Sequence, residues 1–239
     1  MLHILAAGSL RRVWAPLTAL FQTHSGVEVT TQFGPAGLLR RRIEAGEHCD
    51  LFASANAAHP AALTAAGRAR RSFPFASNQL CLTVAAHAAT AHDDWLSLLD
   101  NPGLRLATST PGSDPGGDYA WQFFDNLEKQ RPGLGRTLKQ KAECLVGGPE
   151  SPAIPQGEMA AAWLIHSGQT DMFIGYASYA PRLRQRADLV VYDIPQSLNV
   201  MARYTAAVCS PQGEMLGEFL RSESAADILQ HYGFGRYKY

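Results

Sequence analysis

Ala6-Ala7-Gly8-Ser9-Leu10 lies where a short apolar stretch, beginning at His3, gives way to a stretch with helical periodicity. From about Arg11 to Thr23, apolar residues recur at the spacing of one buried helix face, at Val13, Leu17, Leu20 and Phe21. The pattern predicts a strand, a glycine turn and a helix that Ser9 caps. The first amides of a helix carry partial positive charge and can bind a small anion. Taken alone, the junction is better explained by a serine that only caps its helix.

Two further junctions of the same kind follow. A predicted strand over residues 27–33 runs into Phe33-Gly34-Pro35-Ala36-Gly37 and a short helix that ends at Gly46. A third strand, over residues 50–53, leads into Ser54–Asn56 and a helix near residues 60–66. Repeated strand-to-helix turns of small and polar residues predict an open, largely parallel α/β sheet that binds its ligand beyond the carboxyl ends of the strands.

The composition agrees with this fold class and excludes some classes of binding partner. The chain has 239 residues, of which 46% are hydrophobic and 18% charged, enough for one or two domains with buried cores. With 21 basic and 21 acidic residues, the chain has no broad positive electrostatic field that could hold a nucleic acid or an anionic membrane. The arginines Arg40 to Arg42, Arg70 and Arg71 are interpreted as solvated faces, with a docking surface as the alternative. No apolar run is long enough to predict a membrane span.

Two apolar runs divide the chain. Residues 80–85 leave the first α/β unit, and residues 200–209 return to it after a long middle segment with strands and helices of its own. We therefore predict two lobes, residues 1–81 with 203–239 and residues 82–202, joined by hinge strands near 78–86 and 198–209. Such lobes close around a ligand in the cleft between them.

The predicted second lobe has junctions of the same type. Thr108 to Trp121 contains Pro115-Gly116-Gly117, where bare backbone can approach a ligand. Ser151 to Met159 passes through Gly157 and Glu158 into a helix expected over residues 158–166. The strand over residues 172–176 ends at Tyr176, whose phenol would be a donor if it faces the cleft; core packing is the alternative.

The four cysteines, at positions 49, 81, 144 and 209, show no metal-binding spacing. Free buried thiols are the default interpretation. Because Cys81 and Cys209 both lie in apolar strand-like runs, a disulfide between them is an alternative.

Together these motifs carry a family resemblance. In order they are AAGSL, FGPAG with RRRIEAG, DLFASAN, SDPGGDYA and SGQTDMFIGYAS. Over nearly its whole length the chain resembles the periplasmic molybdate- and tungstate-binding proteins of ABC importers, which have the type II periplasmic-binding-protein fold. The resemblance implies two α/β lobes, each a mainly parallel sheet flanked by helices, with the ligand in the interlobe cleft.

The resemblance also implies a site. In that family the oxyanion is held by serine hydroxyls, backbone amides at helix starts and commonly a tyrosine hydroxyl, without a metal ion or cofactor. Carried over to this sequence, the ligand residues are Gly8, Ser9, Ala36, Gly37, Ala55, Gly116, Glu158 through its N–H, and Tyr176, with Asp114 and Gly157 as further candidates.

The chain departs from the family pattern in two places. The turn Pro35–Leu38 lacks the second hydroxyl of many relatives. In one branch two carboxylates approach the metal centre; Asp114 matches one of them, but the other position is Gly175. We therefore expect a tetrahedral oxyanion held by hydrogen bonds, and we expect Asp114 and Glu158 to turn outward, cap helices or pair with arginines.

By the same resemblance, the partner is an ABC permease with its ATPase, and the protein is a periplasmic monomer that binds no nucleic acid and does not insert into the membrane. Met1 is followed at once by strand residues, so the protein is either cytosolic or a precursor whose signal peptide has been trimmed. We expect trimming, because the family that the chain resembles is exported. Molybdate and tungstate have nearly the same size and charge, and the sequence does not separate them.

Three alternatives remain. A serine hydrolase is disfavoured because Ser9 lacks the Gly-x-Ser-x-Gly elbow and because these histidines are expected at the surface: His24, His59, His87, His92, His166 and His231. A ferric-ion-binding protein of the same fold uses adjacent tyrosines, whereas Tyr176 and Tyr179 are three residues apart. Another small anion, such as sulfate, is the third alternative.

Overall fold

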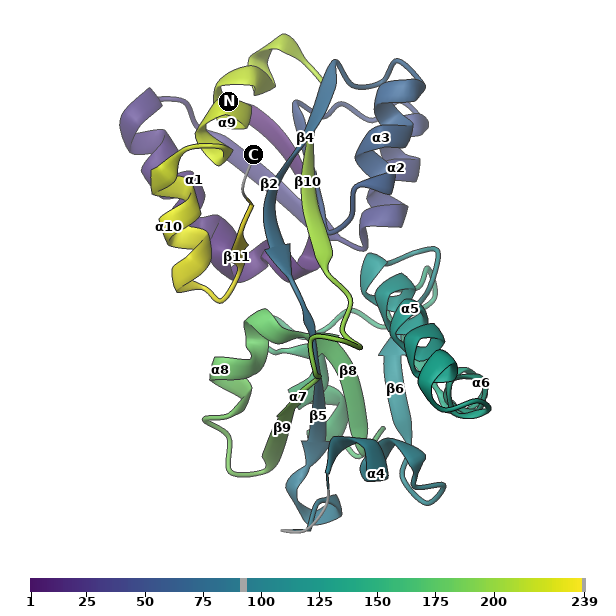
Figure 1. Ribbon diagram of the computed structural model, residues 1–239. Coiled ribbons are helices and arrows are strands. Elements are labelled where there is room, and N and C mark those ends of the chain that lie inside the picture. The colour runs from purple at the N-terminus through teal and green to yellow at the C-terminus, as the bar shows by residue number, and fades with distance from the viewer. Residues whose placement is uncertain (91–93, 238–239) are drawn as a thin grey trace. The chain divides into compact units, whose positions relative to one another are not determined.

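The computed structural model describes residues 1–90 and 94–237. The chain forms two compact units, Met1–Asn78 with Ala202–Tyr239 (unit 1) and Gln79–Met201 (unit 2). Each is an α/β layer structure, which confirms the predicted fold class of helix-flanked sheets (Figure 1). The chain passes between the units after Asn78 and after Met201, whereas the predicted lobe boundaries follow residues 81 and 202.

Unit 1 contains a six-stranded sheet in the order β11-β4-β10-β3-β1-β2. The strands are β1 (Leu2–Ala7), β2 (Val29–Gly34), β3 (Leu51–Ser54), β4 (Arg71–Asn78), β10 (Ala202–Val208) and β11 (Gly235–Arg236). Strands β1, β2 and β3 are parallel, as predicted. The returning strand β10 is antiparallel to both β3 and β4, so the sheet is mixed on that side.

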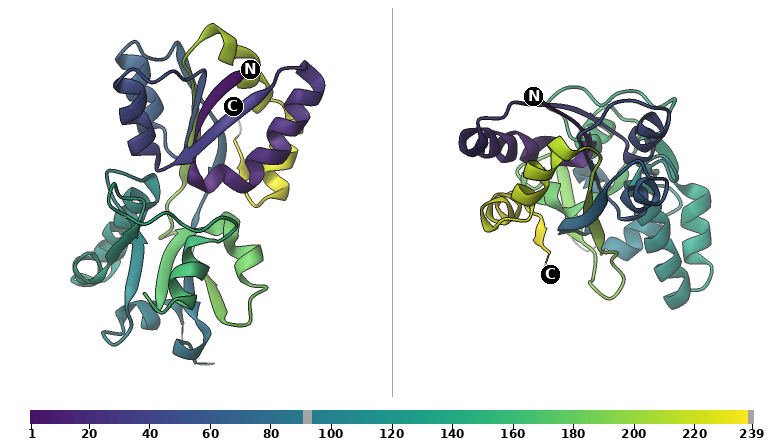
Figure 2. Two further views of the ribbon diagram at one scale, coloured as in Figure 1. Left: turned by 180° about the vertical axis from the view of Figure 1, so that it is seen from behind. Right: turned by 90° about the horizontal axis from the view of Figure 1, so that it is seen from above.

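Helices cover both faces of this sheet. They are α1 (Arg11–Ser25), α2 (Ala36–Glu44), α3 (Ala58–Ala65), α9 (Glu214–Leu220) and α10 (Glu223–His231). Helices α2 and α3 lie on one face, and α1, α9 and α10 lie on the other (Figures 1 and 2). The buried face of α1 is close to the predicted one: Val13, Leu17 and Phe21 are buried, but Leu20 is only half-buried. Trp14 is buried instead, and its Nε1 donates to Thr31 Oγ1 at 2.9 Å.

Unit 2 contains a five-stranded sheet in the order β7-β6-β8-β5-β9. The strands are β5 (Leu80–Ala85), β6 (Leu106–Ser109), β7 (Glu143–Val146), β8 (Met172–Tyr176) and β9 (Leu189–Asp193). Strands β6, β7 and β8 are parallel, and β5 is antiparallel to β8 and β9. The helices are α4 (Trp95–Asp100), α5 (Pro115–Gln130), α6 (Leu134–Lys141), α7 (Ala160–His166) and α8 (Ala180–Leu183). Helix α5 packs on β6 and β8, α6 packs on α5, and α7 packs on β8 and β5.

Strand β4 was not predicted, because it lacks a simple apolar alternation and contains Pro74. Proline has no amide to donate to a sheet ladder. The pairing of β4 with β10 accordingly shifts register where Thr205 lies opposite Pro74. Partners on both sides hold β4 in the sheet despite this interruption, because β10 and β11 flank it.

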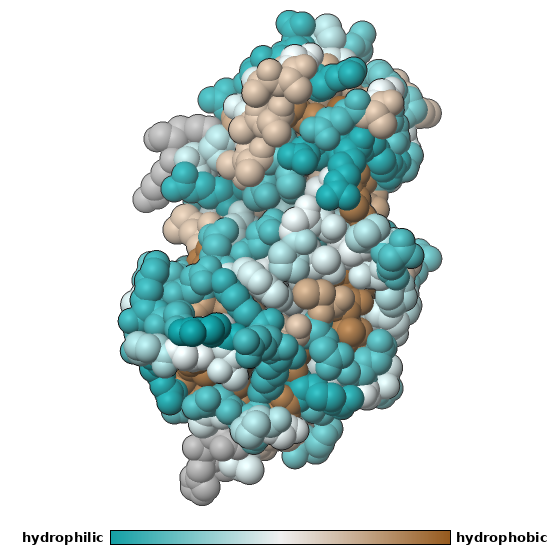
Figure 3. All heavy atoms as spheres, turned by 90° about the vertical axis from the view of Figure 1, so that its right-hand side faces the viewer, coloured by the Kyte–Doolittle hydropathy of each residue, from teal (hydrophilic) through white to brown (hydrophobic). Residues whose placement is uncertain are grey.

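Hydrophilic residues cover most of the surface seen in Figure 3, and apolar residues form small separate areas among them. In the described part of the chain, every helix is too short or too polar to cross a bilayer.

Candidate functional site

The three predicted turns of unit 1 lie at one edge of its sheet. In the parallel register, Ala7 pairs with Gly34 and Ala6 pairs with Ala53. Strands β1, β2 and β3 therefore end side by side, and the turns that begin at Gly8, Pro35 and Ala55 leave the same edge. The sequence predicted this arrangement because the carboxyl ends of parallel strands share an edge.

The prediction that Ser9 caps a helix is wrong. Residues Gly8–Leu10 form a 3-10 turn, and α1 begins after Leu10 without a side-chain cap. Ser9 Oγ instead accepts a hydrogen bond from the phenol of Tyr204 at 2.8 Å. Strand β10 carries Tyr204, which is fully buried against Phe75 and Phe234. The tyrosine is thus a partner of the predicted site that sequence reasoning missed, since nothing near Ser9 in the sequence points to it.

The second turn supplies helix-start amides. Pro35 precedes α2, whose first residues are Ala36 and Gly37, and both are buried. The first amides of a helix have no acceptor within the helix, so they are available in principle to a ligand or a cap. In this helix no side chain provides a cap.

A side-chain network shapes the third turn. Ser54 Oγ donates to Asn56 Oδ1 at 3.1 Å and accepts from the Asn56 amide at 3.2 Å. Asn56 Oδ1 also accepts from the amide of His59, in the first turn of α3, at 3.1 Å. Ala55 lies at the centre of this turn and is 1% exposed.

Unit 2 has a comparable edge, where parallel strands β6, β7 and β8 end. The Tyr176 ring, at the end of β8, approaches Gly116 in the first turn of α5: a Cβ on Gly116 would lie 3.6 Å from Tyr176 Cε2. Tyr176 is 8% exposed and also packs edge-on against Tyr119, with ring centroids 6.4 Å apart. The structure therefore brings Gly116 and Tyr176 together, and Tyr176 serves the core as well.

Asp114 caps α5, one of the roles expected for it. Its Oδ1 accepts a long hydrogen bond of 3.5 Å from the Gly116 amide, and its Oδ2 accepts one from Ser109 Oγ. Burial raises the pKa of the Asp114 carboxyl, while the hydrogen bonds from Ser109 and Gly116 act in the opposite direction. Close by, Gly147 has φ +78°, and a Cβ there would lie 2.2 Å from Ser109 Oγ. Only glycine allows β7 to end this close to the cap.

Glu158 does not lie at the start of a helix, where it was predicted. Helix α7 begins at Ala160, two residues later than expected, so the Glu158 amide is not at the helix start. That amide donates to the carbonyl oxygen of Pro155 at 3.0 Å. The side chain lies 4.0 Å from Arg186, the arginine pairing that was expected. Gly157 and Glu158 are both exposed, with φ +83° at Gly157.

Arg40, Arg42, Arg70 and Arg71 form ion pairs on partly exposed faces. Arg40 pairs with Glu44 at 3.4 Å within α2, and Arg71 pairs with Glu214 at 2.8 Å. These contacts agree with the solvated-face interpretation.

The cysteines do not form the disulfide considered above. Cys81 is buried in β5, and its Sγ donates to the carbonyl oxygen of Tyr176 at 3.7 Å. The Cys209 thiol donates to the carbonyl oxygen of Ala207 at 3.7 Å, and the neighbouring Cys49 thiol lowers its pKa.

His59 was wrongly expected at the surface. It is 7% exposed, and neither ring nitrogen hydrogen-bonds to another described residue. Burial, followed by the charges of Arg40 and Arg41, lowers its pKa to about 4. The other histidines in that group are exposed, namely His24, His87, His166 and His231, while His92 lies outside the described residues.

Among residues 1–90 and 94–237, no cluster of three or more His, Cys, Asp or Glu side chains could hold a metal ion. The ferric-ion alternative concerns Tyr176 and Tyr179. Tyr176 packs beside Gly116 and Tyr119. Tyr179 packs against the core cluster that includes Leu183 and Leu189.

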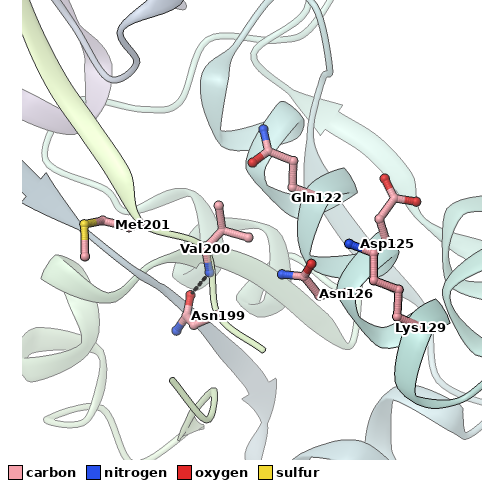
Figure 4. A pocket seen from close by; sticks show the side chains of 7 residues that line it. All are labelled: Gln122, Asp125, Asn126, Lys129, Asn199, Val200 and Met201. Atoms are coloured by element: carbon pink, nitrogen blue, oxygen red, sulfur yellow. Dashed lines mark hydrogen bonds between the residues drawn. The ribbon is translucent and has the colours of Figure 1, made fainter. Parts of the chain in front are cut away.

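A surface pocket of about 460 Å³ lies elsewhere in unit 2, between α5 and residues 199–201 (Figure 4). Asn126 Nδ2, in its wall, donates to the carbonyl oxygen of Leu198 at 3.0 Å, and Asp125 pairs with Lys139 at 2.7 Å. None of the predicted ligand residues is among those that line it, which are Gln122, Asp125, Asn126, Lys129, Asn199, Val200 and Met201. Two of the polar side chains in the pocket wall are thus already engaged. Asn126 holds α5 against Leu198, and Asp125 forms a surface ion pair.

Comparison with known proteins adds independent information. The family described as bacterial extracellular solute-binding protein matches residues 2–235. An uncharacterized protein of Pasteurella multocida is 48% identical over 92% of this chain and 91% of its own length. The molybdate-binding protein ModA of Escherichia coli is 28% identical over 97% of this chain and 87% of its own.

Solved structures share the fold. The periplasmic molybdate-binding protein of Azotobacter vinelandii has a TM-score of 0.78 at 19% identity, with both chains covered completely. The sulfate-binding protein SubI of Mycobacterium tuberculosis scores 0.74 at 17% identity, over 98% of this chain and 85% of its own. Iron-bound HitA of Pseudomonas aeruginosa scores 0.68 at 16% identity, over 99% and 86%. The fold is therefore shared by proteins named for different ligands.

Proposed function

We propose, because this chain belongs to the bacterial extracellular solute-binding proteins, that it binds a tetrahedral oxyanion, molybdate or tungstate, and delivers it to the permease of an ABC importer. The observation that carries this proposal is the pair of sheet edges, each with helix-start amides and a hydroxyl. Unit 1 presents the Ser9–Tyr204 pair beside the start of α2. Unit 2 presents Tyr176 beside Gly116 at the start of α5. The Escherichia coli relative, matched over most of both chains, supports molybdate as the ligand.

The proposal requires one anion to take donors from both units. The proposed donors in unit 1 are the Ser9 hydroxyl and the amides of Ala36, Gly37 and Ala55, with Gly8 allowing close approach. In unit 2 they are the Gly116 amide and the Tyr176 hydroxyl. The Glu158 amide, also expected to bind, would first have to leave the carbonyl of Pro155. Each hydrogen bond to a charged group returns about 1.5–3 kcal/mol, so a small number of donors offsets the lost hydration of the anion.

Neutral donors also favour a fully deprotonated oxyanion. A protonated oxyanion needs an acceptor for its hydrogen. The carboxyl nearest to Gly116 belongs to Asp114, whose oxygens already accept hydrogen bonds from Gly116 and Ser109. Selection between molybdate and the smaller sulfate then depends on the size of the space between the donors.

Thermal melting of the full chain tests this proposal. Molybdate or tungstate at about 100 times the dissociation constant should stabilise the fold by about 2.7 kcal/mol, or about 5–10 °C in Tm. Sulfate, phosphate and ferric citrate serve as the comparison ligands. A shift with sulfate or ferric citrate alone would replace the proposed ligand. Turnover of esterase substrates without any shift would favour the hydrolase instead.

The same proposal includes a periplasmic location and transport without catalysis. The permease and its ATPase receive the loaded protein, which acts as a monomer and needs no cofactor. The family description, extracellular solute binding, supports this setting.

A further inference from the structure

The two cysteines of unit 1 lie at the end of the sheet opposite the candidate ligand residues. Leu51, the first residue of β3, pairs with Val208, the last residue of β10. Cys49 lies two residues before this pair on one strand, and Cys209 follows it directly on the other. The candidate ligand turn at Ala55 follows the other end of β3.

Asp50 locks the two cysteine segments together. Its carbonyl oxygen accepts from the amides of Cys209 at 2.9 Å and Ser210 at 3.3 Å. Its carboxylate accepts from Ser210 Oγ at 2.5 Å and from the His3 amide at 2.8 Å. A Cβ on Gly213 would lie 2.1 Å from the Asp50 carbonyl oxygen, so the chain after Cys209 also folds tightly over this point. Backbone and side-chain bonds together therefore hold Cys49 and Cys209 adjacent.

The two thiols are close enough for each to shift the pKa of the other. Cys209 Sγ donates to the carbonyl oxygen of Ala207 at 3.7 Å, and Cys49 is 5% exposed whereas Cys209 is partly exposed. The neighbouring Cys49 thiol, with help from the Phe52 backbone, lowers the pKa of the Cys209 thiol. Proximity to Cys209, together with burial, raises the pKa of the Cys49 thiol. Cys209 is thus the more accessible and more nucleophilic member of the pair.

From this arrangement we infer that Cys49 and Cys209 form an intramolecular disulfide when the protein meets a disulfide oxidant. The Cys209 thiolate attacks one sulfur of the oxidant, forms a mixed disulfide and expels one thiolate. Cys49 then gives up its proton and attacks Cys209 Sγ, which expels the second thiolate. Two protein thiols are oxidised to one disulfide, and the oxidant is reduced to two thiols.

Such a bond would link the two separate stretches of sequence that build unit 1. It would close a loop that contains all of unit 2, residues 79–201. Closing a long loop restricts the unfolded chain and therefore stabilises the folded one. Disulfides form in oxidising compartments, which suits the extracellular family to which the chain belongs.

The test compares the full chain after treatment with a reducing phosphine and with oxidised glutathione. Differential alkylation and non-reducing peptide mapping should show Cys49 joined to Cys209, while Cys81 and Cys144 stay alkylatable after denaturation. The oxidised chain should melt about 5–10 °C higher than the reduced chain. C209S should abolish this shift, and C144S, which changes the exposed cysteine of unit 2, should retain it.

Two results would overturn the inference. One is free, alkylatable Cys49 and Cys209 after oxidation; the other is an unchanged oxidation-dependent shift in C209S. Should C209S fail to fold, peptide mapping of the unaltered chain decides the question alone.

Discussion

At the scale of single residues, Ser9 and Tyr204 form the contact that most directly concerns the proposed site. The Tyr204 phenol donates to Ser9 Oγ at 2.8 Å and so fixes the position of that hydroxyl. Ser9 lies in a 3-10 turn, and its hydroxyl does not cap α1. The side chain is therefore positioned by a residue 195 positions away in the sequence, for a role other than helix capping.

We expect Ser9→Ala to weaken molybdate binding by about 1–3 kcal/mol, because a buried ligand oxygen loses a partner. Tyr204→Phe keeps the ring packing against Phe234 and should cost less, about 0.5–1 kcal/mol. Isothermal titration calorimetry with molybdate measures both. Ser25→Ala, at the other end of α1, is the matched control and should bind as the unaltered chain does. Unchanged affinity in Ser9→Ala would remove Ser9 from the site.

His59 predicts a pH dependence of stability. Its pKa is about 4 in the folded chain and about 6.5 when unfolded. Between these values the unfolded state binds a proton that the folded state excludes, so the free energy of unfolding falls as pH falls from about 6.5 to 4. The contribution is complete above pH 6.5.

Urea unfolding at pH 7 and pH 5 checks this expectation. The unaltered chain should lose about 1–2 kcal/mol more than His59→Leu between the two conditions. Carboxylates with lowered pKa, such as Asp50, contribute equally to both chains and cancel in the difference. His24→Leu, an exposed histidine, should follow the unaltered chain. Equal losses in the unaltered chain and in His59→Leu would show that His59 is protonated without cost.

At the scale of elements, the end of β7 must approach the N-terminus of α5 closely. Gly147 has φ +78°, and an added Cβ would lie 2.2 Å from Ser109 Oγ and 2.8 Å from Asp114 Cβ. Gly157 has a similar φ of +83°, but a Cβ there meets nothing within 4 Å. Substitutions at these two glycines therefore separate the cost of backbone strain from the cost of a steric clash.

Gly147→Ala should lower the free energy of unfolding by about 3–4 kcal/mol, from about 1 kcal/mol of strain plus the cost of overpacking. Gly157→Ala should lower it by only about 1 kcal/mol. Chemical denaturation of both variants measures the difference. Equal losses would mean that β7 shifts away from the α5 cap at no cost.

At the scale of the whole molecule, the proposal of one ligand with donors from both units makes a specific prediction. Tyr176→Phe, in unit 2, should weaken molybdate binding by about 1–3 kcal/mol, as Ser9→Ala does in unit 1. Because both side chains would contact the same anion, the loss in the double variant should differ from the sum of the two single losses by about 0.5 kcal/mol or more. Calorimetric titration of the single and double variants measures this.

Tyr179→Phe is the control, since Tyr179 packs against the core cluster of unit 2. It should leave the affinity unchanged. Full affinity in Tyr176→Phe would confine the ligand to unit 1 and end the proposal of a shared site.

Local sequence patterns were sufficient to predict many of the strands, helices and turns of this protein. Helical periodicity after Leu10 and the small residues at successive turns predicted β1, α1 and the parallel edge formed by β1, β2 and β3. Strand β8 has the predicted bounds, Met172–Tyr176. These features could be predicted because they depend on residues close together in the sequence, through side-chain periodicity and turn chemistry.

Contacts between distant residues decided the rest. Tyr204 reaches Ser9, Cys209 lies beside Cys49 and not beside Cys81, and His59 is buried with α2 arginines nearby. Strand β4 is held in place by β10 and β11 although Pro74 interrupts its pairing. A single sequence records which residues can pack or hydrogen-bond, but their partners are fixed only when the sheet brings separate strands into register. The sequence by itself therefore determined many of the elements and the resemblance to a family, and the tertiary structure decided which side chains meet.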